Sequence, residues 1–158
     1  MKKIVVLFFL VILAIGHENI IFASFKNQEI EDEAIGQYLQ EVFEERVQIW
    51  NEFMMKGDKD LQSIKKQLME YTTEPLLSFD MNAFEDLLKN PTSYEIIRDV
   101  SIERCQSIEM EGSNRTYLVE IFWVVEAYEE LHREEVEYIV IMEKINDKWL
   151  LSDYQLNR

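Results

Sequence analysis

Apolar residues between Ala34 and Lys56 recur every three or four positions, which is the spacing of one face of an α-helix. This face consists of Ile35, Tyr38, Leu39, Val42, Phe43, Ile49, Trp50, Phe53 and Met54. Acidic residues 31–33 precede it, where the helix dipole favours negative charge, and Gly57 supplies a stop. The pattern predicts one long amphipathic helix.

Two shorter helices are predicted next. Asp58 or Asp60 caps the first of them, and Asp80 or Asn82 caps the second, which lies between the two prolines of the chain. The apolar face of the first consists of Leu61, Ile64, Leu68 and Tyr71. The second carries Phe84, Leu87 and Leu88. The chain is therefore expected to be helical up to its second proline.

From Tyr94 onward the period of the pattern changes to two, and β-branched and aromatic residues predominate. The predicted strands are Ile97–Met110, Tyr117–Tyr128, Val136–Ile145 and Trp149–Leu156. Turns are expected at 112–114 and 146–147, and a charged loop at Glu129–Glu135. The second strand has one wholly apolar face, which must be covered. Helices followed by an antiparallel meander predict an α+β fold, with the helices on one face of the sheet.

The first 23 residues have the pattern of a secretory signal peptide of the bacterial type. Two lysines follow the first residue, Ile4–Ile15 is an unbroken apolar run, and Ala23 and Ser24 offer a cleavage site. The alternative is retention as a membrane anchor, but a spanning helix needs about 20 apolar residues and polar residues 17–19 interrupt the run. We expect a secreted or cell-envelope protein, with a polar leader at 24–33 and a single domain at 34–158.

The net charge of the chain limits the kinds of partner that it can bind. The net charge is −15, and loss of the first 23 residues, with two lysines and one glutamate, would bring it to about −16. Nucleic-acid binding requires a basic stripe, which is absent. Membrane contact is expected only if the N-terminal segment is retained. Since Cys105 is the sole cysteine, no internal disulfide forms, and a buried, inert thiol is expected there.

Catalytic motifs are scarce in this sequence. His132 lies among glutamates, but the spacing matches no metal-ligand pattern. No serine or cysteine has a histidine placed to activate it, and phosphate-binding glycine loops are absent. We therefore expect neither a metal nor a cofactor.

Asp153 is the weak candidate for a catalytic residue. If residues 146–147 form a two-residue turn, Val140 pairs with Asp153, and this carboxylate shares an apolar face. A carboxylate in such a place can serve as a general acid or base. A three-residue turn would instead put Tyr154 on that face.

Three aromatic residues have two interpretations. Tyr38, Trp50 and Trp123 are candidates to line a pocket for an apolar ligand. Aromatic residues at this spacing, however, usually belong to the core.

The chain resembles the nuclear-transport-factor-2-like superfamily, which overlaps in shape with cystatin-like domains. The resemblance is carried by the long helix containing Trp50, the strand Tyr117–Trp123 and the closing hairpin Tyr138–Tyr154. It implies a cone, in which a curved sheet wraps around the helices and opens at one end into a pocket. Residues 72–93 lack the hairpin found between the helices in many members, which implies a smaller, partly open cone.

The superfamily includes isomerases, dehydratases, carriers and exported domains without a catalytic centre. With so few catalytic motifs, we expect a non-enzymatic binding or assembly domain that contacts another cell-envelope or secreted protein. Glu130, Glu134 and Glu135 are candidates for a surface that contacts a basic partner, and the alternative is a solvated turn without a role in recognition. The alternative is a small pocket enzyme of the isomerase or dehydratase type, with a carboxylate as base.

Overall fold

The computed structural model describes residues 31–55, 60–90, 95–127 and 130–158. Its elements are helix 31–55, α2 (Leu61–Leu68), α3 (Leu76–Lys89), β1 (Glu95–Glu111), β2 (Asn114–Ala127), β3 (Glu130–Ile145) and β4 (Lys148–Leu156). The predicted α+β class is confirmed. The predicted signal peptide and most of the predicted polar leader lie outside the described residues. None of the helices in the described ranges has the length and apolarity that crossing a bilayer requires.

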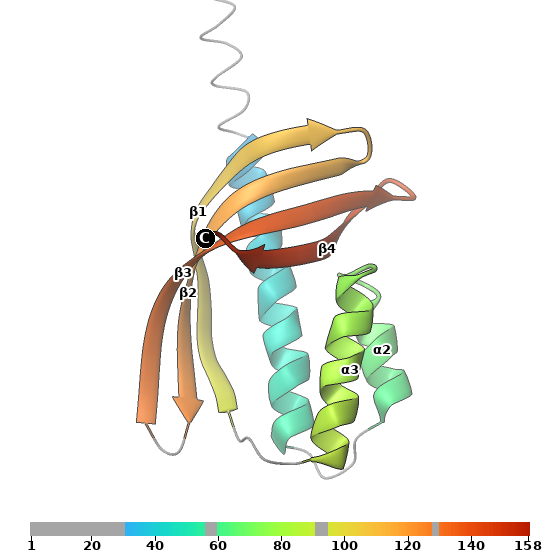
Figure 1. Cartoon of the computed structure of the whole chain (residues 1–158), viewed down its shortest axis with the longest axis vertical. Coiled ribbons are helices and arrows are strands. Elements are labelled where there is room, and N and C mark those ends of the chain that lie inside the picture. The colour runs from blue at the N-terminus through green and yellow to red at the C-terminus, as the bar shows by residue number, and fades with distance from the viewer. Residues whose placement is uncertain (1–30, 56–59, 91–94, 128–129) are drawn as a thin grey trace, which may run out of the picture.

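The four strands form one antiparallel sheet in the order β1-β2-β3-β4. Figure 1 shows that β1, β2 and β3 bend strongly, so that their lower and upper halves run in different directions. Three irregularities in the pairing of β1 with β2, after Ile97, Ile102 and Ser107, accompany this bend. Bulges of this kind increase local twist and bend a strand. The fourth strand pairs only with the second half of β3, from Tyr138 onward.

The apolar face of β2 is covered, as predicted. Tyr117, Val119 and Ile121 are completely buried, and they share a core with Leu39 and Phe43 of helix 31–55. Burial of this area removes apolar surface from water, which is the main stabilising term for a chain without a disulfide.

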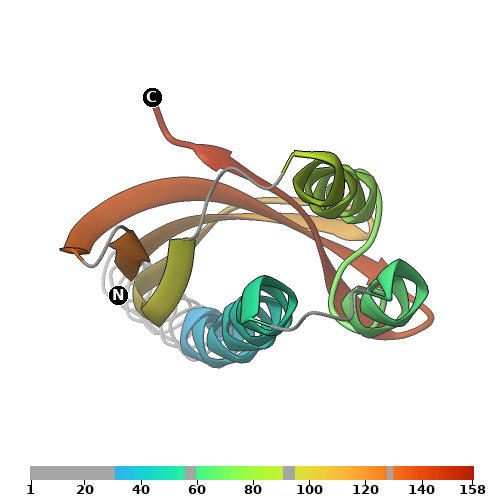
Figure 2. The ribbon, with the colours of Figure 1, turned by 90° about the horizontal axis from the view of Figure 1, so that it is seen from below.

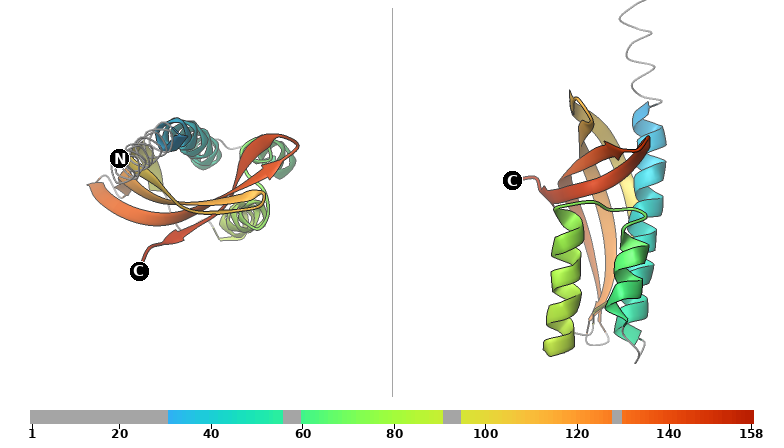
Figure 3. Two further views of the ribbon diagram at one scale, coloured as in Figure 1. Left: turned by 90° about the horizontal axis from the view of Figure 1, so that it is seen from above. Right: turned by 90° about the vertical axis from the view of Figure 1, so that its right-hand side faces the viewer.

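A second core joins the three helices. It consists of Ile49, Phe53, Ile64, Leu68, Leu77 and Phe84. Figures 2 and 3 show α2 and α3 beside helix 31–55, and the right view of Figure 3 shows them below β4. This core therefore packs α2 and α3 against helix 31–55.

Side chains of helix 31–55 cover the outer edge of β1. The Gln40 amide donates to the carbonyl of Val100 at 2.8 Å and accepts from the N–H of Ile102 at 2.7 Å. The Asn51 amide likewise donates to the carbonyl of Ile97 at 2.7 Å and accepts from its N–H at 3.0 Å. These bonds satisfy backbone groups that an edge strand otherwise leaves exposed.

The connection between α2 and α3 covers the outer edge of β4. The N–H of Thr73 donates to the carbonyl of Leu151, and the N–H of Leu151 donates to the carbonyl of Tyr71, both at 2.9 Å. The Ser152 hydroxyl donates to the carbonyl of Glu74 at 2.8 Å. This connection, here called the clasp (residues 71–74), fixes the helices to the last strand.

The boundaries of the predicted helices are partly correct. Asp60 caps α2, since its Oδ1 accepts from the N–H of Gln62 at 2.9 Å. The prediction that Asp80 or Asn82 caps the third helix is wrong, because α3 begins at Leu76 and both residues lie within it. The Asp80 side chain binds Arg46 of helix 31–55 instead of a backbone N–H.

The predicted charged loop at 129–135 is also wrong for the residues that the structure describes. Residues 130–135 belong to β3 and pair with β2, beginning with Glu130 opposite Ala127. Pairing with a partner strand outweighs the low strand propensity of the glutamates.

The closing hairpin has the predicted two-residue turn. Asn146 and Asp147 have φ angles of 49° and 63°, as a type I′ turn requires. The predicted pairs hold as far as Met142 with Leu151. An irregularity at Ser152 then shifts the register, so that Asp153 pairs with Ile141 and Tyr154 takes the place opposite Val140. The predicted Val140–Asp153 pair is therefore wrong.

Candidate functional site

An apolar chamber of about 200 Å³ lies between helix 31–55, α3 and the inner face of the sheet. Its aromatic walls are Phe43, Trp50, Phe79, Phe84, Trp123 and Tyr154. These side chains come from four elements, namely helix 31–55, α3, β2 and β4, and the curvature of the sheet brings them together. The chamber is large enough for one small ring or one apolar side chain.

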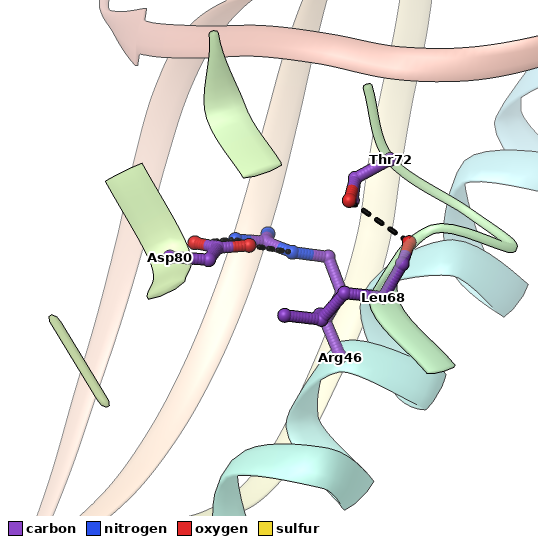
Figure 4. Close-up of polar contacts among 4 residues, drawn as sticks. All are labelled: Arg46, Leu68, Thr72 and Asp80. Carbon is purple, nitrogen blue, oxygen red and sulfur yellow. Dashed lines mark hydrogen bonds and ion pairs between the residues drawn. The ribbon is translucent and has the colours of Figure 1, made fainter. Parts of the chain in front are cut away.

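Arg46 and Asp80 are the charged residues in the lining of this chamber. Figure 4 shows the guanidinium and the carboxylate facing each other. Arg46 Nη2 lies 2.8 Å from Asp80 Oδ1, and Nε lies 3.2 Å from Oδ2, which is a bidentate arrangement. The two side chains are only 11% and 12% exposed. Each therefore supplies the partner that the other needs in an apolar setting.

The surroundings stabilise the charge on Arg46. The guanidinium lies 5.0 Å from the centre of the Tyr154 ring and 5.7 Å from that of Phe43. Burial opposes its charge, but Tyr154 and Asp80 together raise the pKa of Arg46 above its ordinary value. Burial raises the pKa of Asp80, and Arg46 offsets only part of this. With Asp80 bonded on both oxygens, the chamber has no free carboxylate among its described lining residues.

The indole N–H of Trp123, a residue of the chamber lining, lacks a normal hydrogen bond. Its Nε1 is buried without a hydrogen bond of normal geometry, although the hydroxyl of Tyr138 lies within its reach. The Trp123 ring meets Phe43 edge-on, with 5.8 Å between centroids. The indole N–H therefore lies toward Tyr138, which is not among the residues that line the chamber.

A second hollow, here called the groove, lies between the start of α3 and the end of β4 and has a volume of about 370 Å³. It is lined by Pro75, Leu76, Phe79, Tyr138, Asp153, Tyr154, Gln155 and Leu156. Phe79 and Leu156 are 71% and 49% exposed. Because Phe79 and Tyr154 line both hollows, the groove and the chamber share a wall.

The predicted site residues lie in different parts of the structure. Asp153 is half-buried in the groove, not in the chamber. Trp50 and Trp123 line the chamber, and the indole N–H of Trp50 donates to the carbonyl of Glu95 at 3.0 Å. Tyr38 lies elsewhere, where its hydroxyl donates to the carbonyl of Trp149 at 2.6 Å. Burial raises the pKa of Tyr38, which keeps this donor protonated.

The three glutamates of the expected partner surface lie on β3 and are exposed. Glu130 and Glu134 pair with Ala127 and Trp123, so they are on the inner side of the sheet, whereas Glu135 pairs with Phe122 on the outer side. A hydrogen bond to Glu120 and repulsion by the same group raise the pKa of Glu135. The surface is thus a strand edge with acidic groups on both sides.

Arg46, Asp80 and Phe79 were not predicted from the sequence as residues of a binding site. A signal for the first two was present. Arg46 interrupts the apolar face of its helix, three and four positions after Phe43 and Val42. Asp80 stands in the same relation to Leu77 and Leu76 in α3. Opposite charges on two apolar faces indicate a buried pair, because an unpaired charge is costly there.

Metal and thiol chemistry receive no support from the described part of the chain. It contains no group of three or more His, Cys, Asp or Glu side chains that could hold a metal ion. His132 is exposed on β3. Burial raises the pKa of the Cys105 thiol to about 12, with Asp32 contributing, so the thiolate is scarce at neutral pH.

Comparisons with known proteins assign no family. No family model and no curated protein matches this chain. Among solved structures, the crystal structure of the intermembrane space region of the chloroplast protein ARC6 is similar, with a TM-score of 0.46 and 8% sequence identity. The match covers 77% of this chain and 95% of that chain. A likeness of this size carries no argument about function.

Proposed function

We propose that this chain is an exported binding domain of the nuclear-transport-factor-2-like type, which holds a partner protein by an apolar side chain seated in the groove. The observation that supports this best is the position of Phe79. Its ring is 71% exposed on α3 and lines both the groove and the chamber. Exposed aromatic residues beside a pocket are typical anchors of protein interfaces.

The charges of the chamber favour binding over catalysis. A general base needs a carboxylate free to take a proton from a substrate. Asp80 is engaged by Arg46 on both oxygens. The pair therefore fixes helix 31–55 to α3 and leaves the aromatic walls as the surface that a guest contacts.

A small pocket enzyme is the second candidate. It is favoured by the position of Asp153, which shares the groove with the hydroxyl-bearing rings of Tyr138 and Tyr154. In that case Asp153 is the base, and an isomerase or dehydratase reaction takes place in the groove. Asp153→Asn, which keeps the size of the side chain and removes the base, would abolish such an activity.

Export is the first part of this proposal to test. The purified protein from the culture medium is expected to lack the first 23 residues or thereabouts, as measured by intact mass. Recovery only from membranes, with both N-terminal lysines present, would show that the segment is an anchor.

The groove is tested by a pair of matched variants on one helix. Phe79→Ala removes the anchor, and Leu88→Ala removes another exposed apolar side chain of α3 that lies outside the groove lining. Cross-linking to the cell surface and medium of the producing bacterium is expected to capture a partner with the parent protein and with Leu88→Ala. Phe79→Ala should lose that partner. Equal capture by both variants would refute the groove as the binding site.

A further inference from the structure

We propose that the first half of β3 binds an extended, basic segment of the partner as an added strand, in line with β4. This inference rests on the proposed function for a protein partner, and it names the chemistry and the conformation of the segment that is bound. The edge concerned is residues 130–137, here called the open edge.

The open edge differs from the other edges of the sheet. Helix 31–55 covers β1 through Gln40 and Asn51, and the clasp covers β4 at Leu151. Pairing of β3 with β4 ends at Tyr138. Beyond that point, no described residue donates to or accepts from the free side of β3 except Asn157, whose N–H donates to the carbonyl of Glu137 at 2.9 Å.

This single bond shows which backbone groups face outward. Successive residues of an antiparallel strand direct their N–H and C=O groups to opposite neighbours. Since the carbonyl of Glu137 faces away from β2, the same holds for Glu135, Arg133 and Leu131. The pairing of β3 with β2 has no irregularity that would change this alternation.

The other end of β3 gives the same alternation independently. The N–H of Lys144 donates to the carbonyl of Ser113, beside the start of β2, at 2.8 Å. Even-numbered residues therefore face β2, and odd-numbered residues face the opposite side. The N–H and C=O groups of Leu131, Arg133 and Glu135 form a row of unpaired donors and acceptors, which is the template for strand addition.

The charges of the open edge select a basic occupant. Glu130, Glu134 and Glu135 outnumber the single Arg133, and Glu137 is already paired with Arg104 at 2.9 Å. Glu135 is crowded by Glu120, which raises the pKa of Glu135, and a lysine opposite it would relieve that repulsion. A second copy of the chain would instead bring a net negative edge against itself. The charges thus favour a basic partner over self-pairing.

The groove lies at one end of the open edge. Leu156 ends β4 opposite Tyr138, and both residues line the groove with Phe79. A strand antiparallel to β3 would run in the direction of β4 and begin beside the groove. The expected segment therefore starts with an apolar residue at Phe79 and continues with basic residues along the open edge.

The test uses a labelled synthetic peptide, acetyl-Leu-Val-Lys-Val-Lys-Val-Lys-Val, and the purified protein. Binding is followed by fluorescence anisotropy, and amide hydrogen exchange is followed by nuclear magnetic resonance. Exchange at Leu131, Arg133 and Glu135 is expected to slow when the peptide binds, whereas the amides of His132 and Glu134 are already bonded to β2. An electrostatic contact without strand pairing would leave the three odd-numbered amides unprotected and would overturn the proposal.

Two variants of Arg133 distinguish the contribution of its backbone N–H to binding from that of its side-chain charge. Arg133→Pro removes an outward N–H while sparing the bonds to β2, and it is expected to weaken binding on the order of tenfold. Arg133→Ala keeps the N–H and removes a positive charge, so it should bind at least as tightly as the parent. Equal affinity of both variants would show that the edge donors are not used.

Three further outcomes would overturn a basic occupant. The peptide does not bind, or a control peptide with glutamate in place of each lysine binds equally well. The third is that self-association of the protein, without the peptide, protects the odd-numbered amides. Phe79→Ala separates this inference from the proposed function, because it removes the groove contact alone. If it leaves the affinity unchanged while the odd-numbered amides are protected, the groove is refuted and the open edge stands.

Discussion

Arg46 of helix 31–55 and Asp80 of α3 join two helices through parallel hydrogen bonds of 2.8 Å and 3.2 Å inside an apolar chamber. Each charge is nearly removed from water and each is the principal partner of the other. Such a pair adds little net stability compared with an apolar pair, but loss of one partner leaves a buried charge without compensation.

Removal of the Asp80 side chain should therefore lower the stability of the folded protein. We expect Asp80→Ala to lower the free energy of unfolding by about 3 kcal/mol, measured by urea denaturation. The double variant Arg46→Met with Asp80→Leu should recover most of this loss, because neither charge is then left alone. Lys89→Ala on the same helix, which breaks only exposed ion pairs, should change stability by less than about 0.5 kcal/mol. A double variant as unstable as the single one would show that the pair acts through its shape.

Trp123 and Glu120 provide a comparison of the two faces of β2. Trp123 packs against Phe43 on the inner face, and we expect Trp123→Ala to cost about 3 kcal/mol. Glu120 pairs with Arg104 at 3.4 Å on the outer face, and Glu120→Ala should cost less than about 0.5 kcal/mol. Both values are measured by thermal and urea unfolding. Equal losses would contradict the assignment of the covered face.

Cys105 should react slowly in the folded protein. Its thiol pKa is about 12 instead of 9.0, so the thiolate fraction at pH 8 falls by roughly a thousandfold. We expect reaction with a disulfide reagent at pH 8 to slow by a similar factor in native protein relative to protein in denaturant. A rapid reaction of the native protein would mean that the thiol is more accessible than its half-buried position indicates.

Glu135 should make stability depend on pH. Its folded-state pKa is raised above 4.5, mainly by Glu120, so its ionisation is less favourable in the folded than in the unfolded chain. This loss of stability is absent at low pH and appears as the pH rises from 4.5 through the folded-state value. Glu135→Gln should therefore melt at the same temperature as the parent below pH 4.5 and at a higher temperature near neutrality. A difference that is constant across this range would rule out the carboxylate pair as its cause.

The sequence contained enough local information for most of the sheet. The 146–147 turn has the residues that a two-residue hairpin requires, and the apolar side of β2 alternates without interruption. These features depend on neighbours within a few positions. They were therefore predictable from residue pattern alone.

The errors arose where distant partners decide the structure. Residues 130–135 are mostly charged and were expected to form a loop, but pairing with β2 extends the strand through them. The irregularity at Ser152 depends on the clasp, since its hydroxyl donates to Glu74. Asp80 has the composition of a helix cap, yet its partner is a guanidinium on another helix. No local pattern around residues 130–135 or Ser152 indicates such contacts, whereas Arg46 and Asp80 each interrupt the apolar face of a helix and so carry a signal of their pairing.

The clasp also bears on the order in which the molecule is assembled. Its bond from Ser152 to Glu74 joins residues that are 78 positions apart, and its bonds to Leu151 span at least as many. Contacts of such long sequence separation form late and slow the search for the native state. If export delivers the amino-terminal part first, α2 and α3 reach the outside before the strand that fixes them is available. The helices would then remain with part of their apolar surface exposed to water until the final hairpin is exported and pairs with the clasp.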